Sequence, residues 1–208
     1  MNIQIIKYKE EKMKKQKQYN KQSKILTAEE YFQKGNIASE NEEYNEAIFY
    51  YQKSIEINPQ DDVTYYNMGF AYYNKGNYNK AIECYEKSIE INPQYDKAYN
   101  NMGNVYGYKG NYNRAIKYWQ KAIEINPQYD NAYLNMGIAY DDKGNYNKAI
   151  ACYEKAIEIN PQYDKAYYNM GNAYYNKGNN NKAIECWQIA ARMGNVGAQK
   201  SLNIINGD

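Results

Sequence analysis

Four evenly spaced prolines constrain the fold of this chain more than any other feature of its sequence. They lie 34 residues apart, each follows an asparagine, and they are Pro59, Pro93, Pro127 and Pro161. The segments between them are nearly copies: 85–94 and 153–162 differ only by Ser88 in place of Ala156. A fixed period of this length indicates units that cannot bury an apolar face alone and must stack on their neighbours. The sequence therefore predicts a repeat array instead of a single globular core.

Each period contains two helical patterns separated by a glycine turn. In the unit that starts at residue 96, apolar residues at i, i+4, i+7 and i+8 mark one helix face: Ala98, Met102, Val105 and Tyr106. A Lys-Gly-Asn turn follows, in which the glycine can adopt the positive φ that ends a helix and the asparagine can cap the next one. These glycines are Gly76, Gly110, Gly144 and Gly178. The proline then ends the second helix, because it lacks an N–H and restricts the residue before it.

We place five units in a repeat body of residues 25–197: 28–61, 62–95, 96–129, 130–163 and 164–197. Their residue types resemble the tetratricopeptide repeat, which has aromatic, large apolar, Gly, Tyr, Ala, aromatic, Ala and Pro at set places. The third unit supplies Tyr99, Met102, Gly103, Tyr106, Ala115, Trp119, Ala122 and Pro127. The resemblance implies an all-α, right-handed solenoid of five helix-turn-helix units.

A glycine lies inside the first helix of each of the four later units. These residues are Gly69, Gly103, Gly137 and Gly171. Glycine in a helix interior costs roughly 1 kcal/mol relative to alanine, so its presence requires a packing reason. We expect a small residue of the second helix, such as Ala115 opposite Gly103, to let the two helices approach closely. Aromatic side chains then fill the space beside that contact.

The first unit departs from the pattern. Lys34 stands where a large apolar residue is expected, Ala38 replaces the tyrosine, and the turn at 41–43 has no glycine. Terminal repeats are often atypical because one of their sides faces water.

A capping helix is predicted at the other end, over residues 196–205, with Asn195 as its N-cap. We expect Val196, Leu202 and Ile205 to cover the last exposed core of the array. Lys200 and Asn203 are expected to face water.

The residue inventory argues against an enzyme. The chain has no histidine, which removes the commonest general base and the commonest metal ligand. Its three cysteines, Cys84, Cys152 and Cys186, share one repeat position and form no CxxC pair, so we interpret them as buried packing residues. The paired carboxylates at 61–62 and 141–142 lie at helix or turn boundaries, where capping or solvation explains them. We therefore predict no catalytic residue, no metal site and no cofactor.

The net charge of +2 conceals a basic N-terminal segment and an acidic body. Residues 1–24 carry eight lysines against Glu10 and Glu11, a net +6, whereas the remainder carries 18 basic and 22 acidic residues, a net −4. The composition of this segment favours a disordered tail, and an amphipathic helix or a contact with a membrane or nucleic acid is the alternative. The acidic body lacks the basic face of nucleic-acid binders, and no apolar stretch is long enough to span a bilayer. We expect a cytoplasmic protein whose partner is a protein or peptide, not a membrane or a nucleic acid.

Asparagines mark a candidate binding surface. In tetratricopeptide proteins the first helices line an inner, concave groove, and here asparagine occupies the sixth position of four consecutive units and the ninth position of three. An amide side chain offers two donors and an acceptor, which suits the backbone of an extended peptide. The alternative is that asparagine is simply frequent and these positions are solvated. The candidate groove residues are Asn36, Asn67, Asn101, Asn104, Asn135, Asn169, Asn172, Lys97, Lys165, Tyr66 and Tyr168.

A dicarboxylate clamp, a related family feature that grips an acidic peptide end, is incomplete in this sequence. Across units three to five its middle positions are present as Asn104, Asn135 and Lys165, but asparagines replace both outer cations. Those cations supply the charge-assisted hydrogen bonds of the clamp.

Five tyrosines that lie outside the repeat pattern are candidates for exposed aromatic contacts with a partner: Tyr66, Tyr73, Tyr108, Tyr168 and Tyr175.

These features favour a protein–protein interaction scaffold or adaptor. We expect it to bind an extended peptide or a helix of its partner in the concave groove, within a larger complex. Two alternatives stay open. One is an RNA-binding repeat protein whose tyrosines stack on bases, against which the acidic body counts. The other is a docking subunit of an enzyme complex.

Overall fold

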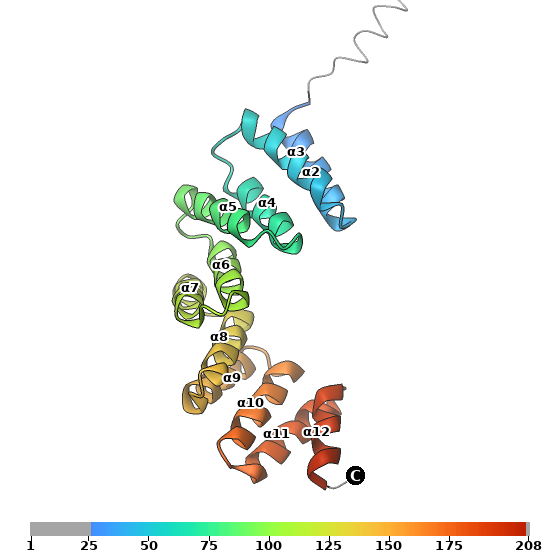
Figure 1. The fold of residues 1–208 in the computed structure, drawn as a ribbon, viewed down its shortest axis with the longest axis vertical. Coiled ribbons are helices and arrows are strands. Elements are labelled where there is room, and N and C mark those ends of the chain that lie inside the picture. The colour runs from blue at the N-terminus through green and yellow to red at the C-terminus, as the bar shows by residue number, and fades with distance from the viewer. Residues whose placement is uncertain (1–25, 207–208) are drawn as a thin grey trace, which may run out of the picture. The chain divides into compact units, whose positions relative to one another are not determined.

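The computed structural model describes residues 26–206, and every regular element in this range is a helix (Figure 1). The chain divides into two compact parts, Met1–Pro59 and Gln60–Asp208, which are described separately. They are called the first unit and the second unit from here on, and the 34-residue periods are called repeats. The predicted basic tail at 1–24 lies outside the described residues. Within 26–206, no helix is both long enough and apolar enough to cross a membrane.

The first unit contains one helix hairpin, α2 (Ala28–Glu40) and α3 (Tyr44–Ile57). A capping box starts α2: the N–H of Glu30 donates to Thr27 Oγ1 at 3.1 Å, and the N–H of Thr27 donates to Glu30 Oε2 at 2.9 Å. The turn after α2 holds Glu42 at a φ of 62°. This left-handed conformation costs a residue with a Cβ about 1–2 kcal/mol, so the missing glycine of this turn leaves strain in the first unit.

The second unit contains four helix hairpins and a final helix. They are α4 (Asp62–Asn74) with α5 (Tyr78–Ile91), α6 (Asp96–Tyr108) with α7 (Tyr112–Ile125), α8 (Asp130–Asp142) with α9 (Tyr146–Ile159), α10 (Asp164–Asn176) with α11 (Asn180–Arg192), and α12 (Val196–Asn206). Each hairpin packs on the next, and α4, α6, α8 and α10 contact one another in order. In Figure 1 this succession runs from the green-blue α4 to the red α12. The stack of consecutive hairpins confirms the predicted all-α repeat fold.

The turns inside these four hairpins have the predicted chemistry. Gly76 adopts a φ of 75°, and Gly110, Gly144 and Gly178 also have positive φ values. The asparagine that follows caps the second helix, as when Asn77 Oδ1 accepts the N–H of Lys80 at 3.3 Å. The same cap is formed by Asn111, Asn145 and Asn179.

The glycines inside the first helices face aromatic rings. A Cβ built on Gly103 would lie 2.5 Å from Nε1 of Trp119, and one built on Gly137 would lie 2.5 Å from Cε1 of Tyr153. These rings are the nearest contacts because a flat ring extends from the second helix across to the backbone of the first and occupies the space beside the glycine. The predicted alanine lies close as well in the fifth repeat, where a Cβ built on Gly171 would lie 3.2 Å from the backbone oxygen of Ala183.

A hydrogen bond not predicted from the sequence ties the end of each complete repeat of the second unit to its start. Asn126 Nδ2 donates to Asp96 Oδ2 at 2.7 Å, and Asn126 Oδ1 accepts the N–H of Gln128 at 3.1 Å. The asparagine before each proline thus bridges the linker and the first turn of the first helix. The equivalent bonds join Asn92 to Asp62 and Asn160 to Asp130.

The final helix α12 closes the second unit. Asn195 Oδ1 accepts the N–H of Ala198 at 2.9 Å, which confirms the predicted N-cap. Leu202 and Ile205 pack on the last core together with buried Ala198, as expected of the first two. Val196 does not: it is 61% exposed, because its place in the first turn directs it away from that core.

Candidate functional site

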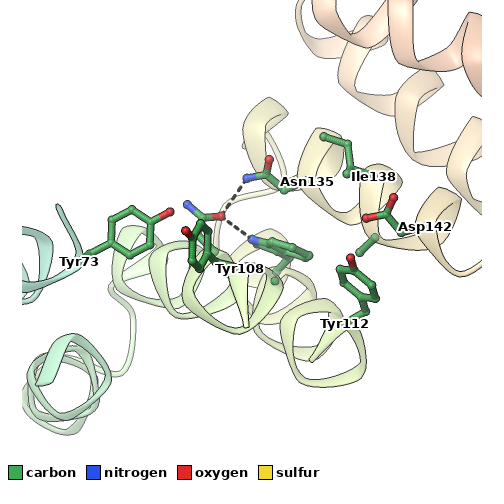
Figure 2. A pocket seen from close by; sticks show the side chains of 10 residues that line it. Tyr73, Tyr108, Tyr112, Asn135, Ile138 and Asp142 are labelled. Carbon is green, nitrogen blue, oxygen red and sulfur yellow. Dashed lines mark hydrogen bonds between the residues drawn. The ribbon is translucent and has the colours of Figure 1, made fainter. Parts of the chain in front are cut away.

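A chain of side-chain hydrogen bonds joins the first helices α4, α6 and α8 of the second unit. Asn101 Nδ2 donates to the Tyr66 hydroxyl at 3.1 Å, and Asn104 Nδ2 donates to Asn101 Oδ1 at 3.4 Å. Asn135 Nδ2 donates to Asn104 Oδ1 at 3.0 Å, and Trp119 Nε1 donates to the same oxygen at 3.0 Å (Figure 2). The structure therefore brings three predicted asparagines and one predicted tyrosine into one polar network.

The ninth-position asparagines hold the aromatic residue of the second helix. Trp187 Nε1 donates to Asn172 Oδ1 at 3.0 Å, which repeats the bond between Trp119 and Asn104. In the first unit, the Tyr51 hydroxyl donates to Asn36 Oδ1 at 2.9 Å. Both tryptophans of the chain thus pair with a ninth-position asparagine.

The hydrogen bond between tryptophan and the ninth-position asparagine was not predicted, although the sequence contains a signal for it. In the two other repeats of the second unit, tyrosine replaces tryptophan, and an apolar residue, Phe70 or Ile138, replaces asparagine. An indole N–H that is buried requires an acceptor. The joint appearance of tryptophan and asparagine at a spacing of 15 residues could therefore have predicted the bond.

The other predicted residues of the second unit lie on the first helices α4, α6 and α10. Asn67 on α4 and Asn169 on α10 are half-buried. Lys97 and Lys165 are exposed in the first turns of α6 and α10. Tyr168 is half-buried and packs against the core that α12 covers, where a Cβ built on Gly197 would lie 3.0 Å from its ring. Asn36 belongs to the first unit and is described only there.

The tyrosines beside this network differ in exposure. Tyr66 is half-buried, its ring lies 5.0 Å from that of Tyr95 at an interplanar angle of 43°, and burial raises the pKa of Tyr66. Tyr108 is 69% exposed, and its ring lies 4.6 Å from that of Tyr78. A hydrogen bond with Tyr108 raises the pKa of Tyr78 to about 12. Tyr175 is 51% exposed, so two of the five tyrosines predicted as exposed contacts are exposed.

A pocket of about 380 Å³ opens between α6 and α8, beside the polar network (Figure 2). Its lining residues are Tyr73, Asn104, Gly107, Tyr108, Tyr112, Trp119, Asn135, Ile138, Ala139 and Asp142. The Asp142 carboxylate faces the Tyr112 hydroxyl at one side and raises the pKa of Tyr112. The surface thus combines amides, aromatic rings and one carboxylate.

The buried thiols and the carboxylate of Asp61 contribute to packing and helix capping. Cys84, Cys152 and Cys186 are buried and unpaired by disulfides, as predicted. Burial raises the pKa of Cys84 to about 12, which disfavours the reactive thiolate. Asp61 caps α4 by accepting the N–H groups of Val63 and Thr64, as expected for that pair.

Successive helix hairpins with polar and aromatic residues along their first helices define a helical-repeat scaffold for protein interactions. Family models of the tetratricopeptide repeat match residues 28–61, 63–95, 96–129, 118–151 and 164–193, and a model of the TPR repeat matches 139–178. The chain belongs to the tetratricopeptide repeat family.

Solved structures support the same assignment. The crystal structure of MamA protein is 30% identical over 83% of this chain and 94% of its own, with a TM-score of 0.72. YrrB, described as a TPR protein with an unusual peptide-binding site, is 25% identical over 90% of this chain and 96% of its own, with a TM-score of 0.69. PilF of Pseudomonas aeruginosa, at 18% identity, shares the fold with a TM-score of 0.77 over 87% of this chain and 85% of its own. A comparison with curated proteins finds no match.

Proposed function

We propose that this chain is an adaptor that binds an extended peptide or a helix of a partner protein in a groove along α4, α6, α8 and α10. The observation that carries this proposal is the hydrogen-bonded succession of Asn101 and Asn104 on α6 with Asn135 on the next first helix, α8. Asparagine side chains that are fixed by hydrogen bonds in this way present their amide groups at the spacing of the repeats. Such an arrangement suits a peptide backbone because little side-chain freedom remains to be lost on binding.

The network also assigns different roles to the asparagines. The side-chain oxygen of Asn104 accepts two hydrogen bonds, from Asn135 and Trp119, which uses both of its lone pairs. Asn104 therefore orients its neighbours. The oxygen of Asn101 also accepts two hydrogen bonds, from Asn100 at 3.3 Å and Asn104 at 3.4 Å, but these are longer, and a peptide group can replace one of them. We assign peptide contact to Asn101, Asn135 and Asn169 at the sixth position. Lys97 and Lys165, exposed in the same first turns of alternate repeats, would contact polar groups at the edge of the peptide.

An affinity capture with the full chain tests the proposal. The test variant combines Asn101→Ala, Asn135→Ala and Asn169→Ala. Each lost hydrogen bond is worth about 0.5–1.5 kcal/mol, so affinity for a captured partner should fall at least about tenfold. Calorimetry with the purified partner measures this change, and circular dichroism checks that the variant is folded.

A matched control distinguishes the first helices from the second helices. Asn79, Asn113 and Asn147 are exposed asparagines at one shared position of the second helices. Replacing these three by alanine should leave the affinity within about twofold. A partner that binds the first variant normally, or that loses affinity equally with both variants, would refute the assignment to the first helices. If the captured partner is an enzyme, the chain acts as its docking subunit.

A further inference from the structure

The pocket between α6 and α8 exists because one repeat lacks a side chain that the others have. At the twelfth position of the first helix, the repeats of the second unit carry Tyr73, Gly107, Asp141 and Tyr175 in order. Gly107 leaves the surface open between Tyr108 and Ile138, both of which are exposed. The remaining side of this opening is formed by Asn104 and Asn135 of the polar network (Figure 2). We call this opening the Gly107 slot.

The fifth repeat shows what a ring does at the same position. There the ring of Tyr175 lies 5.7 Å from that of Trp187 at an interplanar angle of 41°. The two tryptophans are held alike, since Trp119 and Trp187 each donate to an asparagine at 3.0 Å. Both are buried, so that only an edge of the indole reaches the surface. The third repeat therefore has the tryptophan and its asparagine, but not the ring that packs against the tryptophan.

We infer that the Gly107 slot binds an aromatic side chain of the partner peptide. This inference rests on the proposed function and specifies a residue that the peptide must contain. The incoming ring takes, against Trp119, the place that Tyr175 takes against Trp187. Tilted ring pairs at this separation are favourable beyond the area they bury. The pocket volume of about 380 Å³ lies within the range of small-ligand sites.

The negative charge of Asp142 at the Gly107 slot favours certain residues next to the aromatic side chain of the partner peptide. Asp142 is the one charged residue among the described residues that line the pocket, and Asp141 precedes it on α8. A carboxylate at the rim favours a cationic neighbour and repels an acidic one. The preferred ligand is thus an aromatic residue flanked by lysine or arginine. Its backbone would run along Asn135, which lines the pocket and belongs to the amide network.

Nuclear magnetic resonance of the indole N–H groups tests this inference on the full chain. The two tryptophans give two indole signals, which single substitutions by tyrosine assign. The probe is the acetylated and amidated peptide Lys-Phe-Gly-Lys, compared with Lys-Ala-Gly-Lys, Lys-Leu-Gly-Lys and Glu-Phe-Gly-Glu. The Phe peptide should shift the Trp119 signal in a saturable way, with a dissociation constant on the order of 1 mM. The Ala and Leu peptides and the acidic Phe peptide should each bind at least about fivefold more weakly.

Two variants test the slot by filling it in the third repeat and by opening an equivalent one in the fifth. Gly107→Tyr copies the fifth repeat and should abolish the response of Trp119. A Cβ at this position would lie 3.0 Å from Cη2 of Trp119, a contact that a small movement of the ring relieves. Tyr175→Gly should create a response at Trp187 that the natural chain lacks. Circular dichroism of both variants verifies that they are folded.

The results also separate the slot from the proposed function. No saturable shift of Trp119 with the Phe peptide, equal binding of the Leu peptide, or an unchanged response in Gly107→Tyr would each overturn the slot. A partner that loses affinity with the Asn101, Asn135 and Asn169 variant but binds Gly107→Tyr normally would leave the groove standing and refute the slot. A slot that binds the Phe peptide while the asparagine variant leaves partner affinity unchanged would refute the groove alone.

Discussion

The indole N–H of Trp119 donates to the side-chain oxygen of Asn104 at 3.0 Å, and this one contact links the packing of a repeat to its exposed face. Trp119 is buried between the two helices, whereas Asn104 is half-buried and also accepts from Asn135 of the next repeat. A change in the core of the third repeat is therefore transmitted to the amides on its first helix.

Replacing Asn104 tests this link. Asn104→Ile leaves a buried indole N–H without its acceptor, which should lower the free energy of unfolding by about 1–3 kcal/mol. The double variant Asn104→Ile with Trp119→Tyr copies the pairing of Ile138 with Tyr153 in the fourth repeat. It should recover part of the loss, giving a coupling of at least about 0.5 kcal/mol in a double-mutant cycle from urea titrations. Additive losses would show that the hydrogen bond does not matter to stability.

The strained turn of the first unit offers a stabilising substitution. Glu42 has a φ of 62°, the conformation that glycine adopts in the later turns. Glu42→Gly should slow hydrogen exchange in α2 and α3 by relieving about 1 kcal/mol of backbone strain. The reverse change, Gly110→Ala, meets no atom within 4 Å and should cost about 1 kcal/mol through its φ of 73° alone. Faster exchange in Glu42→Gly would mean that the Glu42 side chain stabilises the turn.

The tie between Asn126 and Asp96 should contribute to stability. Asn126→Ala removes an amide donor to a carboxylate at 2.7 Å and an acceptor for the N–H of Gln128. Hydrogen bonds to charged groups contribute about 1.5–3 kcal/mol, so the midpoint of urea unfolding should fall clearly. Asn147→Ala, at an exposed position of α9, is the control and should change stability by less than about 0.5 kcal/mol. Equal effects of the two substitutions would contradict the role of the tie.

The cysteines should be protected in the folded chain. Burial raises the pKa of Cys84 to about 12 and that of Cys152 and Cys186 to about 11, above the ordinary value near 8.5. A raised thiol pKa stabilises the fold below the unfolded pKa, and this contribution is lost as the pH rises from about 8.5 towards the folded values. At pH 8, alkylation by iodoacetamide should therefore be much slower in the native protein than in urea. Rapid native alkylation, followed by mass spectrometry, would place these thiols at the surface.

The amino-acid sequence by itself determined the period, the helix boundaries and the turns of this protein. These features depend on residues close together in the chain: Gly76 needs only its own lack of a Cβ to adopt a positive φ, and Asn77 needs only an N–H three residues away. The repeated prolines, and the resemblance to the tetratricopeptide repeat that rests on their spacing, were therefore sufficient to predict the fold class.

The tertiary structure alone decided which side chains meet. Asn104, which the sequence marked for a peptide, is engaged by Trp119, and the ring of Trp119 fills the space beside Gly103. Tyr66 joins the amide network, whereas Tyr168, at the same repeat position, packs below α12 because the array ends there. The Gly107 slot likewise depends on the neighbouring helix. Such contacts depend on how rings and helices pack in three dimensions, and a repeat pattern read along one chain does not contain that information.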